Sequence, residues 1–61
     1  MTPKKIAACW VSQMSDDDKH DIAVVGNAEA WREGIATAEQ TPTRAHTDAI
    51  IEEIERLIMK A

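Results

Sequence analysis

The sequence contains very few of the aromatic residues that usually fill a large core and of the cysteines that cross-link a small one. Phenylalanine and tyrosine are missing, so Trp10 and Trp31 are the only large aromatic side chains among 61 residues. Cys9 is the only cysteine, which excludes an intramolecular disulfide and suits a reducing compartment. A chain of this length buries only about 60% of its unfolded surface. We therefore expect one domain, residues 1–61, that needs a partner or a second copy of itself for stability.

Long hydrophobic runs are missing as well. The apolar stretch that follows Lys4 and Lys5, residues 6–8, is far shorter than the about 7 to 15 residues of a signal-peptide core. No segment of the sequence approaches the about 20 apolar residues of a membrane span. We therefore expect a cytoplasmic protein that does not contact a membrane.

The excess of one charge sign is modest. Eleven Asp and Glu residues against seven Lys and Arg residues give a net charge of -4 at pH 7. This negative net charge disfavours a general electrostatic attraction to nucleic acid. It is also smaller than the charge expected of a protein that imitates DNA. The basic residues that a nucleic-acid-binding protein would use are dispersed among carboxylates, namely Lys4, Lys5, Lys19, Arg32 and Arg44. Nucleic-acid binding by a small dimer is therefore an alternative to the function that we favour.

The chain does contain strong helix-forming patterns, and the clearest covers residues 41–61. Thr41 is placed to cap a helix whose first residue would be Pro42, where a missing N–H has no cost. At about 100° per residue, two threonines and the apolar side chains share one stripe: Thr43, Thr47, Ile50, Ile51, Ile54, Leu57, Ile58 and Ala61. Either the other helices or a second copy must cover this stripe. We predict a homodimer, because so short a chain needs stabilisation beyond its own core.

Two shorter helices are predicted near the N-terminus. Thr2 and Pro3 supply a cap and a first helical residue, and the apolar face that follows carries Ile6, Trp10 and Met14. Ser15 then caps a second helix, and the helix dipole favours the negative charges of its first turn, Asp16, Asp17 and Asp18. The β-branched run at residues 22–25 would also suit a buried strand, but a lone strand would need a dimeric sheet. We therefore predict helix up to Gly26, which can take the left-handed conformation after it.

A third helix is predicted over residues 28–39, with Asn27 as its cap. Its apolar face carries Ala28, Trp31, Ile35 and Ala38. Small residues recur every four positions beside that face, at Ala30, Gly34 and Ala38. A glycine inside a helix costs about 1 kcal/mol relative to alanine. We therefore expect Gly34 to lie where another helix backbone crosses closely.

No residue pattern indicates catalysis. Asp16 and His20 are four residues apart on the predicted second helix, but a zinc site needs three or four converging ligands. Cys9 lies in mid-helix beside Trp10, where we expect a small packing residue and not a nucleophile. The chain has no glycine-rich phosphate loop, no CxxC pair and no HExxH motif. We therefore expect no enzymatic activity, no cofactor and no metal.

These patterns predict an all-α fold, a compact bundle of three to four short helices with a longer C-terminal amphipathic helix, in a dimer. The residues expected in the core or in self-association are Trp31, Gly34, Ile35, Ile50, Ile54, Leu57 and Ile58. Met59 projects about 180° from Ile50, so we expect it on the polar side of the last helix. The residues expected to bind a partner protein are Trp10, Asp16, Asp17, Asp18, Glu52, Glu55 and Met59.

A short chain with no targeting signal and no catalytic constellation is typical of a regulator or an inhibitor. We predict a non-enzymatic protein that binds another protein and blocks access to it, with an acidic helical face steering the encounter. Proteins of this size are common in phages and mobile elements, which is the origin we expect. The alternatives are the nucleic-acid-binding dimer and a structural or assembly module.

Overall fold

The longest helix, α4 (Arg44–Lys60), is the element on which the rest of the chain packs. The computed structural model describes residues 2–60, so Ala61 of the predicted stripe lies outside the described residues. Within this range the chain forms α1 (Pro3–Gln13), α2 (Asp16–His20), the π-helical turn η1 (Asp21–Val25), α3 (Ala28–Glu39) and α4, with no strand. The all-α prediction is confirmed for the described residues.

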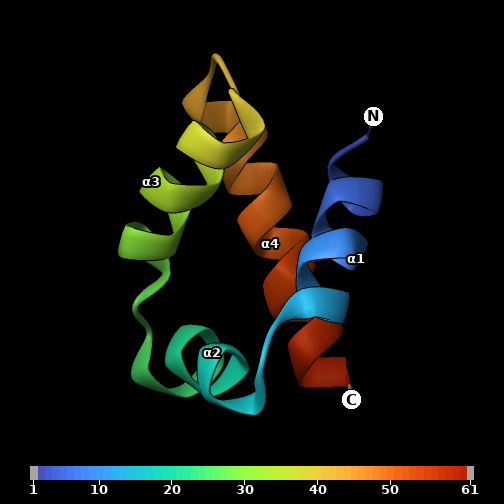
Figure 1. Cartoon of the computed structure of the whole chain (residues 1–61), viewed down its shortest axis with the longest axis vertical. Helices are drawn as coiled ribbons and strands as arrows, with labels where there is room; N and C mark the ends of the chain where they lie inside the picture. The colour runs from blue at the N-terminus through green and yellow to red at the C-terminus, as the bar shows by residue number, and fades with distance from the viewer. Residues whose placement is uncertain (1, 61) are drawn as a thin grey trace.

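The helices α1 and α3 both pack on α4, and η1 contacts α3 and α4 at one end of the molecule (Figure 1). Their shared core is aliphatic and consists of Ile6, Ala7, Met14, Ile22, Ile35, Ile50, Ile51 and Ile54. Four residues of the C-terminal stripe, Thr47, Ile50, Ile51 and Ile54, are at most 2% exposed within a single chain. The other helices of the same chain therefore cover most of this stripe.

The predicted starts of α1 and α2 are confirmed by their capping hydrogen bonds. The backbone N–H of Lys5 donates to the Thr2 hydroxyl at 3.4 Å. The backbone N–H of Asp18 donates to the Ser15 hydroxyl at 3.2 Å. Each hydroxyl satisfies one of the N–H groups that a helix leaves without an internal partner.

The segment after α2 is helical and not a strand. Residues 16–20 form α2, and residues 21–25 continue it as the wider π-helical turn η1. Gly26 ends this turn at φ 81°, in the left-handed conformation expected for it. The predicted bounds of α3 are confirmed, with Asn27 at the N-cap position, but the Asn27 side chain makes no capping hydrogen bond and its amide donates to the Asp21 carboxylate at 3.3 Å.

The predicted start of α4 is wrong by two residues. The helix begins at Arg44, and its cap is Thr43, whose hydroxyl accepts the backbone N–H of His46 at 3.2 Å. The reason lies at the end of α3, where Gln40 takes a left-handed φ of 53°. The backbone N–H of Thr41 then donates back to the Ala36 carbonyl at 2.9 Å. Thr41 therefore closes α3 and cannot open α4.

Three small residues are more exposed than expected. Cys9, Gly34 and Ala38 all lie on the surface, so the predicted packing of Cys9 and Ala38 is wrong. A Cβ added at Gly34 would meet no atom within 4 Å, so no other helix of the described chain crosses there. The physical reason is that α3 faces the core through Ile35, which leaves Gly34 on the outer side.

Replacing Gly34 with alanine is expected to raise the free energy of unfolding by about 0.5 to 1 kcal/mol. Gly34 lies inside a helix, where alanine restricts the unfolded chain and adds helix propensity. The added methyl group enters open space. Urea unfolding followed by circular dichroism measures the change, with Gly26→Ala as the contrasting variant, because its left-handed φ makes the same substitution strained. A loss of stability in Gly34→Ala would contradict the open surface at this position.

None of the helices within residues 2–60 combines the length and the apolar character needed to cross a membrane.

A candidate binding cleft between two tryptophans

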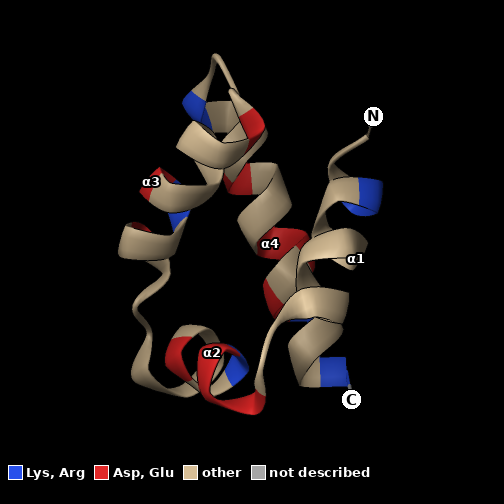
Figure 2. Cartoon of the chain, viewed as in Figure 1, with Lys and Arg blue, Asp and Glu red and all other residues tan. Residues whose placement is uncertain are grey.

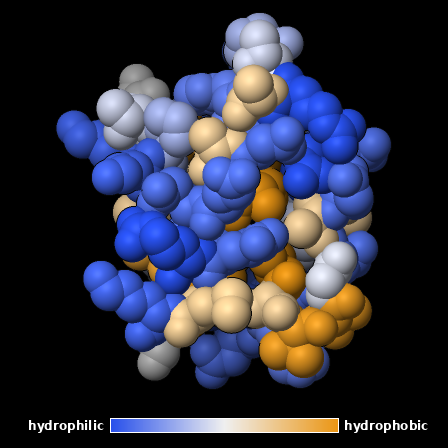
Figure 3. Space-filling view, turned by 180° about the vertical axis from the view of Figure 1, so that it is seen from behind, coloured by the Kyte–Doolittle hydropathy of each residue, from blue (hydrophilic) through white to orange (hydrophobic). Residues whose placement is uncertain are grey.

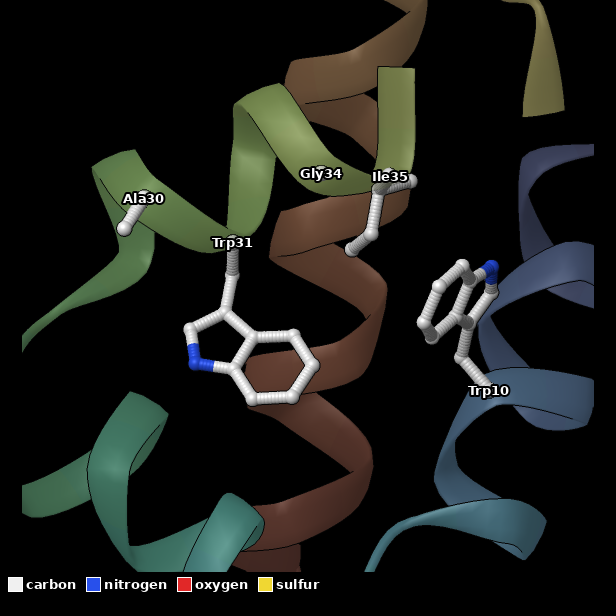
Figure 4. A pocket seen from close by; sticks show the side chains of 5 residues that line it. All are labelled: Trp10, Ala30, Trp31, Gly34 and Ile35. Atoms are coloured by element: carbon white, nitrogen blue, oxygen red, sulfur yellow. The ribbon is translucent and has the colours of Figure 1, made fainter. Parts of the chain in front are cut away.

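The candidate site is an open apolar cleft between α1 and α3. It has a volume of about 220 Å³ and is lined by Trp10, Ala30, Trp31, Gly34 and Ile35. Figure 4 shows the two indoles on opposite sides of the opening, Trp10 from α1 and Trp31 from α3, with Ile35 between them and α4 behind. Only Ile35 is fully buried, while both tryptophans are half-buried. The cleft is therefore a hollow in the surface and not a closed cavity.

Each indole is held in place by a hydrogen bond to a carboxylate on another element. Trp10 Nε1 donates to Glu39 Oε1 at 2.9 Å, which links α1 to the end of α3. Trp31 Nε1 donates to Asp21 Oδ2 at 2.9 Å, which links α3 to η1. Asn27 Nδ2 donates to the same Asp21 oxygen at 3.3 Å. Because both N–H groups already have acceptors, the indoles turn carbon surface toward the opening.

Two of the five residues that line the cleft, Ala30 and Gly34, are small. Ala30 and Gly34 lie one helical turn apart on the exposed side of α3. Neither has a side chain long enough to fill the space between the two indoles. Gly34 lies next to Ile35 at the opening, and a Cβ added there would meet no atom within 4 Å, so a larger residue at position 34 would extend into the cleft (Figure 4).

Comparisons of the chain with family models, curated proteins and solved structures found no match. We therefore infer a function from the chemistry of the cleft and of the surface around it.

The structure brings together residues that the sequence had placed in two different sets. Trp10, expected to bind a partner, lines the same cleft as Trp31, Gly34 and Ile35, which were expected in the core or in self-association. The other residues of that second set pack in the interior, Ile50 and Ile54 fully and Leu57 and Ile58 partly.

The remaining residues expected to bind a partner are spread over two elements. Asp16 and Asp17 are exposed and Asp18 is half-buried at the start of α2, which Figure 2 shows as an acidic end of the molecule. On α4, Glu52 is exposed and Glu55 is half-buried. Met59 is 76% exposed, which confirms its predicted place on the polar side of the helix.

The sequence did not predict the two residues that fix the positions of the indoles. Glu39 accepts a hydrogen bond from a tryptophan 29 positions away, and Asp21 from one 10 positions away. Neither separation follows the spacing of a helix face, so no local pattern links these carboxylates to the indoles. Only the packing of α1 and α3 on α4 brings them together.

A second exposed apolar surface lies at η1. Val24 and Val25 are 71% and 64% exposed, because η1 turns only Ile22 fully into the core. Figure 3 shows hydrophobic atoms gathered at the lower edge of the back of the molecule, on the side where η1 lies. These two valines were not among the residues expected to bind.

The arginines are engaged within the chain. Arg32 contacts the carboxylates of Glu29 and Asp48, the latter at 2.5 Å, and so joins α3 to α4. The hydrogen bond to Glu29 raises the pKa of Arg32 above its usual value, against the opposing effect of burial. Arg44 lies 3.2 Å from Glu29, and Arg56 lies 2.7 Å from Glu53. No guanidinium group of the described residues is therefore free of an acidic neighbour.

The residues considered for acid–base or metal chemistry do not converge. His20 is exposed and His46 is half-buried on a different element. Cys9 is exposed, and its sulfur accepts a hydrogen bond from the Gln13 amide at 3.5 Å. Among residues 2–60, no three His, Cys, Asp or Glu side chains are placed to share a metal ion.

Proposed function

We propose that this chain is a small non-enzymatic regulator that binds another protein and acts by steric occlusion. The observation that supports this function is the open cleft with an indole on each side and a carboxylate behind each indole. Tryptophan is enriched among the residues that dominate binding energy at protein interfaces. Held in fixed positions, the two indoles lose little conformational entropy when a partner covers them.

The charge distribution supports a basic partner surface. Each arginine contacts a carboxylate of its own chain, while no ion pair within the described residues involves Asp16, Asp17 or Glu52. Carboxylates of this kind at the edge of an interface increase the rate of association with a positively charged partner. They contribute much less to the affinity itself, since exposed ion pairs are weak.

The test is capture from a lysate of the source cells by the immobilised protein, with the bound protein and nucleic acid both identified. We expect a protein with a basic surface, and we expect its capture to fall in a variant that carries Asp16→Lys and Asp17→Lys. A variant with Lys4→Glu and Lys5→Glu is the matched control and should retain the partner. Capture of DNA or RNA without protein would contradict the proposal and favour the nucleic-acid-binding alternative.

The homodimer belongs to the same proposal, with a different surface from the one first expected. Ile50, Ile51 and Ile54 are buried inside one chain, so they do not need a second copy. Among residues 2–60, the large apolar side chains that are still exposed are Val24, Val25 and Met59. Light scattering over a concentration series should show a dimer that Val25→Glu weakens, and a monomer at all concentrations would contradict it. A cytoplasmic location and a phage or mobile-element origin complete the proposal.

A further inference from the structure

We infer that the cleft between Trp10 and Trp31 receives one large apolar side chain from a basic amphipathic helix of the partner protein. This inference rests on the proposed function and names the partner surface that the cleft fits. It follows from the size of the cleft, the chemistry of its walls and the position of the carboxylates at its two ends.

The size of the cleft suits a side chain better than a small-molecule ligand. Its volume of about 220 Å³ lies below the about 300 to 1,000 Å³ of typical small-molecule sites. An apolar cavity of about 150 Å³ is large enough to hold benzene. The cleft therefore has room for one leucine, methionine or phenylalanine side chain.

The walls of the cleft select an apolar occupant. They consist of two indole rings, an alanine methyl group, a glycine and an isoleucine. Both indole N–H groups already donate to carboxylates, so neither offers a hydrogen bond to an occupant. A polar side chain would lose its hydration there without gaining a partner.

The two carboxylates select positive charge on either side of that apolar residue. Glu39 is the last residue of α3, and Asp21 holds Trp31 near the start of the same helix. Eight residues separate position 31 from position 39, which is about two helical turns. A partner helix lying along α3 would therefore match them with Lys or Arg four residues before and four residues after its apolar residue.

A second copy of this chain does not fit that description. Each copy has a net charge of -4, so the acidic ends of the cleft would repel it. The exposed Val24 and Val25 follow closely after the acidic run at residues 16–18 and are not flanked by cations at helical spacing. The occupant is therefore a helix of another protein.

Gly34 supports the presence of an occupant. A glycine inside a helix costs about 1 kcal/mol relative to alanine, yet nothing in the described chain lies close enough to require it. The space that its missing side chain leaves is part of the cleft. Because the position is exposed, Gly34→Leu would fill the cleft without disturbing the core.

The experiment measures binding of a dye-labelled helical peptide to the full chain by fluorescence anisotropy. The peptide is alanine-based, with one central leucine and lysines four residues before and after it. We expect saturable binding to the wild-type chain and a dissociation constant at least about tenfold higher for Gly34→Leu, a factor set by the lost apolar contact. Ala8→Leu adds the same side chain at an exposed position of α1 outside the cleft and should bind as the wild type does. Circular dichroism verifies that both variants are folded.

Two companion peptides test the stated chemistry. Replacement of the central leucine by alanine should abolish binding, as should replacement of both lysines by glutamate. Equal binding of the peptide to Gly34→Leu and to the wild type would overturn the inference, and so would equal binding of the glutamate peptide. Conversion of a dimer to a monomer by Gly34→Leu would also overturn it, because the occupant would then be a second copy.

The outcome separates this inference from the proposed function. If Gly34→Leu still captures the partner protein from the lysate, regulation by protein binding stands and the cleft inference fails. If the peptide binds in the cleft but the lysate yields only nucleic acid, the proposed function fails and the cleft chemistry stands.

Discussion

Replacing Ile54 with alanine is expected to lower the free energy of unfolding by about 2 to 5 kcal/mol, the usual range for truncation of a buried isoleucine. Ile54 is fully buried on α4, among the core isoleucines that α1, η1 and α3 cover. The truncation removes apolar contacts and leaves a cavity that the surrounding helices fill only in part.

The consequence is large because the whole domain is small. A single core of this size rarely supplies more than about 3 to 5 kcal/mol. The Ile54→Ala chain should therefore be largely unfolded at 37 °C, with the loss of its helical circular dichroism signal as the measurement.

Two controls define the result. Ile54→Val keeps most of the side chain and should cost about 0.5 to 1.5 kcal/mol in urea unfolding. Glu52→Ala lies at an exposed position of the same helix and should change stability by less than about 0.5 kcal/mol. A cost below 1 kcal/mol for Ile54→Ala would show that the stripe is not buried as described. A midpoint that rises with protein concentration would show that dimerisation contributes to the stability, and the comparison is therefore made at one low concentration.

Replacing Trp31 with alanine is expected to cost about 2 to 3 kcal/mol of stability and to abolish binding in the cleft. Truncation of a fully buried tryptophan costs about 3 to 5 kcal/mol, and Trp31 is only half-buried. Its indole packs against the core and also joins α3 to η1 through Asp21. The variant should therefore loosen η1 as well as one wall of the cleft.

The conservative variant Trp31→Phe separates these two contributions. It retains an aromatic ring but cannot donate to Asp21, so we expect a cost of about 1 kcal/mol, typical of one hydrogen bond. In a chain that already carries Asp21→Ala, the same substitution should cost less, because the acceptor is gone. Denaturant unfolding of the four chains measures this coupling. No coupling between the two positions would show that the hydrogen bond does not stabilise the fold.

The helix starts that the sequence predicted correctly are those set by short-range contacts. Thr2 and Ser15 each cap a helix through a hydrogen bond to a backbone N–H three residues later. Gly26 ends η1 because glycine has no Cβ and takes the left-handed conformation without steric cost. Such contacts depend on neighbouring residues alone, so they can be read before the fold is known.

The errors arose where a distant or unusual conformation decided the outcome. Gln40 takes a left-handed conformation that residues other than glycine rarely adopt, and this moved the start of α4 from Pro42 to Arg44. Asn27 is the N-cap residue of α3 as predicted, but its side chain hydrogen-bonds to Asp21 of η1 and not to the backbone of α3.

The candidate site followed from the sequence only in part. Trp10, Trp31, Gly34 and Ile35 were all singled out, but nothing in their spacing indicated that they share one cleft. The indole hydrogen bonds to Glu39 and Asp21 join segments that no helical periodicity relates.

The sequence by itself determined that the chain forms helices and that the apolar stripe of the last one must be buried, because capping residues and a 3.6-residue period are local properties. The tertiary structure decided what covers that stripe and which surface stays open. α1, η1 and α3 bury Ile50, Ile51 and Ile54 within one chain. The same packing leaves Gly34 and Ala30 exposed in the wall of a cleft that two indoles flank. The relative positions of whole helices decide which apolar or small-residue face is left without a neighbour. No single helix contains that information.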